Sequence, residues 1–199
     1  MILADSEIWS LIKKKDLIIH PILEPDQVHC AKVDVRLDNV VYGIRRLERA
    51  SFDVWEDDPK KYTELKKIPF DQKLVLHPFD FMTAPLFEMF KLPKDLAGRL
   101  DGRSSLGRLG IIVHTTAAGI DPGYSGKVAC ELVNLGTVPV TIRPLTRIAS
   151  ISFERIEGTV DWDYARRKEM KLGKYGTRIE SAMSQDTDKE KIAAMIQRL

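Results

Sequence analysis

Short stretches in which apolar and polar residues alternate, or in which apolar residues run together, recur along most of this chain. They are rich in β-branched and aromatic residues, and proline, glycine or aspartate separates them, as expected of strands joined by tight turns. The stretches expected to form strands are residues 17–19, 31–37, 40–44, 73–77, 81–90, 110–115, 126–135, 138–144 and 149–154. So many short strands with few helices indicate a mainly β fold, either a barrel or a double-sheet arrangement.

Helices are expected mainly near the two ends of the sequence. Asp5 or Ser6 can cap a short amphipathic helix that closes with three lysines at 13–15, where the helix dipole favours positive charge. Thr187 and Glu190 resemble a capping box, and an apolar stripe follows them to the end of the sequence. Single helical turns are expected at residues 93–96 and 104–108, the second with Ser104 or Ser105 as its cap, and one more within the charged loop 51–68.

Glu131 lies in the middle of one of the most apolar strand stretches. Alternation places Ala129 and Val133 on the same side of the strand as Glu131. The opposite side is also apolar, with Val128, Cys130 and Leu132. Because an ionised carboxylate is costly to bury alone, such a residue usually holds a buried cation, binds a ligand or has a raised pKa suited to proton transfer. Glu131 is therefore a candidate catalytic residue.

Composition limits the classes of partner. The 199 residues suit one domain, and 31 basic against 29 acidic side chains give a net charge of only +2, which favours neither nucleic acid nor a membrane. Two cysteines are too few for a disulfide framework. The sequence starts with acidic rather than basic residues, and no apolar run approaches the ~18 residues of a membrane span. We therefore expect a soluble protein of the reducing cytoplasm.

The segment from Arg103 to Arg108 has the composition of a phosphate-binding loop. Glycines at 102 and 107 allow close approach of the backbone, Ser104 and Ser105 supply hydroxyl groups, and the two arginines supply guanidinium forks. The segment matches neither a P-loop nor a GxGxxG fingerprint, and Gly-Arg-Ser clusters also occur in ordinary loops. The next polar segment, residues 119–124 with sequence GIDPGY, is by itself an ordinary turn, but it lies between this cluster and Glu131.

Taken together, these segments resemble the dCTP deaminase family, within the trimeric dUTPase-like superfamily. The matching motifs are GRSSLGRLGI from Gly102, VHTTA from Val113, IDPGYSG from Ile120, Glu131 in the next strand and the N-x-G-x-x-P-V-x-I-x-P run from Asn134. Further matches are the AKVDVRL strand from Ala31, the segment from Leu92 to Leu100 and Lys174-Tyr175. The resemblance covers most of residues 1–178, which we expect to form one domain of distorted-barrel or jelly-roll-like dUTPase fold, followed by a 179–199 tail.

The resemblance implies hydrolytic deamination of dCTP to dUTP and ammonia, a step of pyrimidine deoxynucleotide biosynthesis. Glu131 would be the proton shuttle, Ser104 and Arg108 would orient the water and the glutamate, and Ala117 would border the water site. The substrate-binding residues that it implies are Arg103, Ser104, Ser105, Leu106, Gly107, Arg108, Asp121, Ala129, Cys130, Glu131, Tyr164, Lys174 and Arg178. Among them, residues 103–108 would face the triphosphate, Asp121 the deoxyribose, the backbone of residues 129 and 130 the pyrimidine, and the C-terminal residues the sugar and phosphates.

The family also implies a homotrimer with sites at subunit interfaces, Mg²⁺ bound through the nucleotide phosphates, and dTTP as a common feedback inhibitor. No zinc is expected, because zinc deaminases carry H-x-E with P-C-x-x-C and this sequence has neither. One glutamate can perform the proton transfers if a dry setting and a neighbouring arginine poise its pKa.

Three alternatives stay open at this point. The first is a bifunctional enzyme that continues to dUMP and pyrophosphate. It stays open because Ala117-Ala118-Gly119 matches neither the A-H-R-I-D pattern of deaminases that stop at dUTP nor the A-G-[FW]-I-D pattern of bifunctional relatives. A pure dUTPase is less favoured, because that branch does not need a glutamate at position 131. A nucleotide-binding regulator without turnover is the third, since Arg178 replaces the glutamine of relatives and the terminal helix offers a partner surface.

Overall fold

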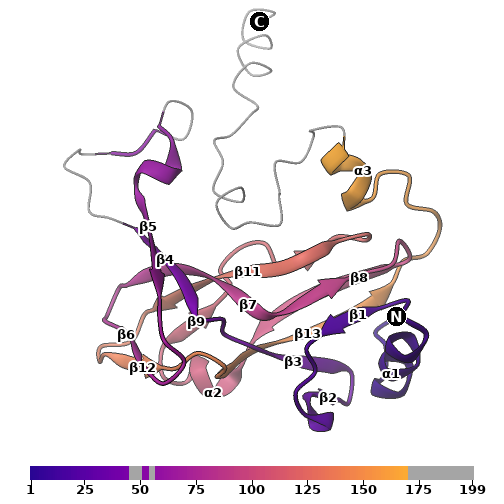
Figure 1. The fold of residues 1–199 in the computed structure, drawn as a ribbon, viewed down its shortest axis with the longest axis horizontal. Helices are drawn as coiled ribbons and strands as arrows, with labels where there is room; N and C mark the ends of the chain where they lie inside the picture. The colour runs from indigo at the N-terminus through magenta and orange to yellow at the C-terminus, as the bar shows by residue number, and fades with distance from the viewer. Residues whose placement is uncertain (45–50, 54–56, 170–199) are drawn as a thin grey trace, which may run out of the picture.

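Two antiparallel sheets make up most of the computed structural model, which describes residues 1–44, 51–53 and 57–169 (Figure 1). The first sheet has the order β5 (Thr63–Lys67), β4 (Val40–Ile44), β7 (Phe81–Lys91), β11 (Ser125–Asn134), β9 (Ile111–Val113), and β1 (Ile18–His20) also pairs with β7. The second has the order β10 (Gly119–Ile120), β8 (Leu96–Gly102), β13 (Arg147–Arg155), β3 (Lys32–Arg36), β2 (Val28–His29). A separate pair joins β12 (Val140–Ile142) to β6 (Leu74–Leu76).

The helical segments are short and lie around the sheets. They are α1 (Asp5–Lys14), η1 (Pro25–Gln27), η2 (Pro59–Lys61), α2 (Ser104–Gly107) and α3 (Tyr164–Glu169). Among the described helices, none is long and apolar enough to cross a membrane.

One apolar core joins the two sheets. β7 contributes Leu86 and Phe90, β3 contributes Val35, and β13 contributes Phe153, all fully buried in a single cluster. The main chain joins the sheets as well, because the Asp38 amide, just beyond β3, donates to the Pro85 carbonyl of β7 at 3.1 Å. Burial of apolar surface at roughly 25 cal/mol per Å² is the main force that holds such layers together. The mainly β, double-sheet fold expected from the sequence is confirmed.

Most of the expected strands and helices are present, and β4 has the expected bounds. The helical turn expected at residues 93–96 is wrong, because Leu96 begins β8, in which Leu96, Gly98 and Leu100 alternate with more exposed neighbours. The charged loop 51–68 contains the expected turn, η2, but also β5, whose side chains are mostly exposed. β5 pairs with β4 through its backbone along all five residues. Because its side chains need not be buried, its sequence shows no apolar pattern that would have predicted a strand.

Two details of the helix ends differ from expectation. The N-cap of α1 is Ala4 rather than Asp5 or Ser6, and no side chain caps it. The N-cap of α2 is Arg103, again without a side-chain cap. The expected roles of Lys174 and Arg178, the 179–199 tail and the terminal helix lie outside the described residues.

Candidate active site

Glu131 stands on the outer face of β11, directly across from Thr83 of β7. As alternation predicted, Val128, Cys130 and Leu132 point to the core, whereas Ala129 and Val133 share the half-covered face with Glu131. The Glu131 side chain is 26% exposed. A carboxylate in this position is partly shielded from water but can still be reached from outside the single chain.

The partner of Glu131 within the described residues is a histidine. Nδ1 of His114 lies 2.9 Å from Oε2 of Glu131, and the Thr115 amide donates to the same oxygen at 3.2 Å. The His114 amide also donates to the Glu131 carbonyl at 2.8 Å, which continues the pairing between β9 and β11. His114 has a φ of 72°, a left-handed conformation that is uncommon outside glycine and that turns the chain just after β9.

The pair shifts both pKa values in the direction expected of opposite charges. The hydrogen bond from His114 is the largest cause that lowers the pKa of Glu131, against an opposing effect of burial. The same hydrogen bond raises the pKa of His114, and the backbone of Ala117 acts in the same direction. The ring is 8% exposed, and neither of its nitrogens has a well-aligned hydrogen bond within the described residues. We conclude that a close ion pair, with imperfect hydrogen-bond geometry, holds Glu131 ionised.

Residues 104–107 form the short α2, and Arg103, its N-cap, follows immediately after β8. Its turn is closed by Gly107 and Arg108 amides that donate to the carbonyls of Arg103 and Ser104, both at 3.0 Å. Ser104, Ser105 and Arg108 are exposed, whereas Leu106 packs against the core and anchors the turn. The hydroxyl and guanidinium groups expected to face a triphosphate are therefore presented on the surface.

In one chain, the structure does not join α2 to Glu131. No hydrogen bond or ion pair connects Glu131 with Ser104 or Arg108 anywhere in the described segments. Ala117 is the one further residue of the expected catalytic set that lies near the pair, through its backbone effect on His114. Within the described part of one chain, the partner of Glu131 is therefore His114 and not the arginine that the sequence suggested.

The turn at Asp121 is held by residues from two other segments. The Gly123 amide donates to the Pro93 carbonyl at 3.2 Å, and the Tyr164 amide donates to the Pro122 carbonyl at 2.9 Å. The rings of Tyr124 and Tyr164 pack with centroids 4.9 Å apart. Tyr164, expected from a C-terminal arm, therefore lies beside the turn that carries Asp121.

The carboxylate just before Tyr164 strengthens this contact. Asp163 is buried and pairs with Nζ of Lys94 at 2.7 Å, and its other oxygen accepts from the Arg166 amide at 2.8 Å. Lys94 is the first-ranked cause that lowers the pKa of Asp163. Gly123 approaches so closely that a Cβ there would lie 3.2 Å from the Asp163 Cβ.

Ala129 and Cys130 present a strand edge. β9 pairs with β11 only from Leu132 to Asn134, so no strand in the described segments covers that edge at residues 129 and 130. The Cys130 side chain is buried, donates to the Ala84 carbonyl and has its pKa raised to about 12, chiefly by burial. The side chain of Cys130 is therefore not available to a ligand, and the part of this residue at the open strand edge is its backbone.

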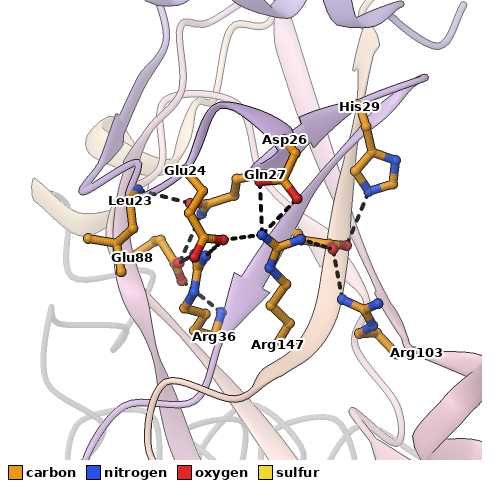
Figure 2. Close-up of polar contacts among 10 residues, drawn as sticks. Leu23, Glu24, Asp26, Gln27, His29, Arg36, Glu88, Arg103 and Arg147 are labelled. Carbon is orange, nitrogen blue, oxygen red and sulfur yellow. Dashed lines mark hydrogen bonds and ion pairs between the residues drawn. The ribbon is translucent and has the colours of Figure 1, made fainter.

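A network of charged and polar side chains reaches Arg103, at the start of α2 (Figure 2). Arg103 donates through Nη1 to Oδ2 of Asp34 at 2.7 Å, and Arg147 reaches the same oxygen at 3.3 Å. Arg147 also contacts Glu24 and Asp26. Deeper in the core, Glu88 accepts from Arg36 and Gln27. Asp34 was not among the predicted site residues, although a charged residue inside an apolar strand stretch is a signal of the same kind as Glu131.

A protein-held metal site is not evident in the described part of the chain, where no three His, Cys, Asp or Glu side chains are grouped to hold an ion.

The fold and the site define a mainly β, double-sheet protein with a carboxylate–imidazole pair on the half-covered face of one strand. The dCTP deaminase-like family model matches residues 2–156. The chain is 40% identical over 168 residues to "dCTP deaminase, dUMP-forming" of Dictyoglomus turgidum, covering 84% of this chain and 87% of the relative. It is 36% identical over 170 residues to the dCTP deaminase of Haloarcula marismortui, with the same coverages of 84% and 87%. This chain therefore belongs to the dCTP deaminase-like family.

A solved structure agrees with this assignment. The crystal structure of 2'-deoxycytidine 5'-triphosphate deaminase from Agrobacterium tumefaciens superposes with a TM-score of 0.62 at 30% identity and covers 78% of this chain. The matched part is 48% of that protein, so this chain spans about half its length.

Proposed function

We propose that this enzyme converts dCTP and water to dUTP and ammonia, with Glu131 as the proton shuttle. The observation that carries the proposal is the ion pair at 2.9 Å between Glu131 and His114 on the half-covered face of β11, beside the unpaired backbone edge at Ala129 and Cys130. A pyrimidine that hydrogen-bonds to this edge would bring its ring close to the Glu131 carboxylate. The names of the relatives support deamination of dCTP.

The reaction needs a group that first takes a proton and then gives one. Water attacks C4 of the cytosine ring while Glu131 removes its proton, and the protonated carboxyl then delivers that proton to the ring nitrogen. The second water proton follows by the same route to the departing amine, so that ammonia leaves and the C4 carbonyl remains. Glu131 begins ionised, and so free to accept a proton, because His114 lowers its pKa. General acid–base catalysis of this kind contributes typically about 10²–10⁴-fold.

The triphosphate is proposed to bind at the surface formed by residues 103–108, with Mg²⁺ bridging its oxygens. Exposed hydroxyl and guanidinium groups at Ser104, Ser105 and Arg108 suit an anion. Gly107 leaves open space above the backbone, where a Cβ would meet nothing within 4 Å. Asp121 and Tyr164 are placed together by the contact between their segments, which supports a shared role at the deoxyribose.

The complete site is proposed to lie between subunits of a homotrimer. Ser104 and Arg108 make no polar contact with Glu131 in the described part of one chain, although all three are expected to act on one substrate. A second copy that brings its α2 to the β11 face of the first would satisfy both requirements. Mixing subunits tests this: Glu131→Gln and Arg108→Ala proteins, each inactive alone, should regain activity when they are exchanged into common oligomers.

Product analysis tests the reaction directly. Purified protein is incubated with dCTP and Mg²⁺, and ammonia and uridine nucleotides are measured over time. Equal amounts of ammonia and dUTP are expected. Tight binding of dCTP without ammonia would reject the deaminase in favour of a nucleotide-binding regulator. Adding dTTP to the same assay examines the feedback inhibition that the family implies.

A second candidate is a bifunctional enzyme that continues to dUMP and pyrophosphate. It is favoured by the name of the Dictyoglomus turgidum relative, and the Pseudarthrobacter chlorophenolicus relative, 35% identical over 178 residues, is also called dUMP-forming. The Haloarcula marismortui relative is named without that addition. Asp121 is the residue proposed to position the second water. Pyrophosphate released in step with ammonia would identify the bifunctional reaction, and accumulation of dUTP would exclude it.

A further inference from the structure

Asp34 is a buried carboxylate on which three basic side chains converge. It lies on β3 opposite Ser150 of β13, and its side chain is 8% exposed. Oδ2 accepts from Nη1 of Arg103 at 2.7 Å and from Nη1 of Arg147 at 3.3 Å, while Oδ1 lies 3.3 Å from Nε2 of His29 (Figure 2). Both oxygens of the carboxylate are thus engaged from different directions.

The position of Asp34 is fixed independently of Arg103. β3 is paired on both sides, by β2 and by β13. Arg147, which approaches Asp34 from β13, is itself held by Glu24 and Asp26. A carboxylate on a paired strand with a second, anchored cation cannot follow the movements of a surface arginine. It can instead serve as a fixed point to which that arginine is attached.

Arg103 has little else to determine where its guanidinium points. Its side chain is 35% exposed, it precedes α2 as the N-cap, and Asp34 is its one ion-pair partner among the described residues. The Asp34 contact occupies Nη1, which leaves the donors of Nε and Nη2 for a ligand. Because a guanidinium is a planar fork, fixing one nitrogen also fixes the plane in which the others lie.

We propose that Asp34 is a positioning residue that holds the Arg103 guanidinium in the orientation in which it binds the substrate's phosphates. This inference rests on the proposed function, because it takes the ligand of α2 to be a nucleoside triphosphate. Neutralising Asp34 does not by itself require Arg103, since Arg147 already reaches the same oxygen. When a long, flexible side chain is already ordered before the ligand arrives, binding does not cost the conformational entropy of that side chain. This saving corresponds to about three- to tenfold in affinity.

Asp34→Asn tests the proposal, since asparagine keeps the shape and one acceptor oxygen but removes the charge. We expect the KM for dCTP to rise about three- to tenfold while kcat stays within about twofold, because Asp34 acts on phosphate binding and not on the proton transfers. Asp26→Asn is the matched control: Asp26 also pairs with Arg147, is 71% exposed and does not contact Arg103. Its KM should equal that of the wild type.

Testing Asp34→Asn with and without the Arg103 side chain distinguishes a role in positioning Arg103 from a general loss of stability. In an Arg103→Ala background, Asp34→Asn should cause no further rise in KM, because the side chain that it positions is gone. An unchanged KM in the single variant, or an equal rise in both backgrounds, would overturn the proposal. If Asp34→Asn does not fold, Asp34→Glu is measured in its place. This variant keeps the charge for Arg147 and His29 but displaces Arg103. A wild-type KM in Asp34→Glu would overturn the proposal.

Direct measurement of ligand binding tests the role of Asp34 separately from the proposed reaction. The Kd of dCTP and of inorganic tripolyphosphate is measured by calorimetry for the wild type, Asp34→Asn and Asp26→Asn, and both ligands should bind Asp34→Asn about three- to tenfold more weakly. A wild type that binds dCTP but releases no ammonia would reject the deaminase and leave this comparison intact. Equal Kd values in all three proteins would reject the role of Asp34 even if deamination is observed.

Discussion

Nδ1 of His114 lies 2.9 Å from Oε2 of Glu131, so the proposed proton shuttle is paired with an imidazole in the described part of the chain. A histidine differs from an arginine as a partner because it can lose its charge near neutral pH. When Glu131 accepts a proton during the reaction, the attraction within the pair weakens, and His114 then loses its own proton more readily. The pairing therefore links the protonation of Glu131 to that of His114.

The shifted pKa of His114 can be observed directly. His114 should titrate above its ordinary value of 6.5, because the hydrogen bond and charge of Glu131 favour the protonated ring. Glu131→Gln removes that charge, so the pKa of His114 should fall. An NMR titration of the four histidines, with His114→Ala for assignment, measures both values. An unchanged His114 pKa in Glu131→Gln would contradict the ion pair.

The same pair should contribute to stability in a defined pH range. Because the pKa of His114 is raised in the folded protein, its contribution to stability is complete below pH 6.5 and is lost as the pH rises through the pKa of the folded state. Because the pKa of Glu131 is lowered in the folded protein, its contribution to stability is complete above pH 4.5 and is lost as the pH falls through the pKa of the folded state. The stability difference between the wild type and Glu131→Gln should therefore be largest between these limits. Urea unfolding at a series of pH values provides the measurement.

Glu131→Gln should abolish deamination and leave nucleotide binding largely intact. Glutamine keeps an oxygen acceptor but cannot carry a proton, so kcat should fall by at least about 10²–10⁴-fold with little change in the Kd for dCTP. Single-turnover kinetics and calorimetry check the two parts. Glu157→Gln, at an exposed position outside the site, is the control and should behave as the wild type. Turnover within tenfold of the wild type in Glu131→Gln would remove the proposed shuttle.

The buried Glu88 should be a major stabilising residue. Its fully buried carboxylate accepts from the Arg36 guanidinium at 3.0 Å, from the Arg36 amide at 2.9 Å and from Gln27 at 2.9 Å. Glu88→Ala leaves these donors without their acceptor and should lower the free energy of unfolding by about 3–5 kcal/mol. The double variant Glu88→Leu with Arg36→Met should lose less, because it removes the charges together. Equal losses in the two proteins would show that packing, and not the ion pair, sets the cost.

Gly110 should tolerate no side chain. Its φ is +84°, and a Cβ there would lie 2.5 Å from the Gly136 nitrogen, closer than real contacts allow. Gly110→Ala should therefore lower the free energy of unfolding by about 2–3 kcal/mol or more and displace α2, which ends just before it. Gly43→Ala is the control, since a Cβ there meets nothing within 4 Å and φ is not positive. Thermal unfolding of the two proteins distinguishes the outcomes.

Local patterns in the sequence were sufficient for much of the fold. Alternation located β4, β7, β11 and β13, because a strand with one buried face imposes a period of two on its side chains. The same reasoning singled out Glu131 and assigned Val128, Cys130 and Leu132 to the core face, which the structure confirms. The composition of residues 103–108 located α2 and its exposed polar groups.

Other features depend on contacts between residues that are distant in the sequence. β5 is a strand because β4 lies beside it, not because its own charged residues favour one. Asp34 and Arg103 are 69 residues apart, and nothing local to either predicts that they meet.

The sequence by itself determined which segments become strands, which loop carries the arginines and which acidic residue is out of place among apolar neighbours. Only the tertiary structure decided that His114 is the partner of Glu131 and that Asp34 is the partner of Arg103. The physical reason is that alternation and turn chemistry act over a few residues, whereas the register and packing of the two sheets determine which side chains come within hydrogen-bond distance of one another.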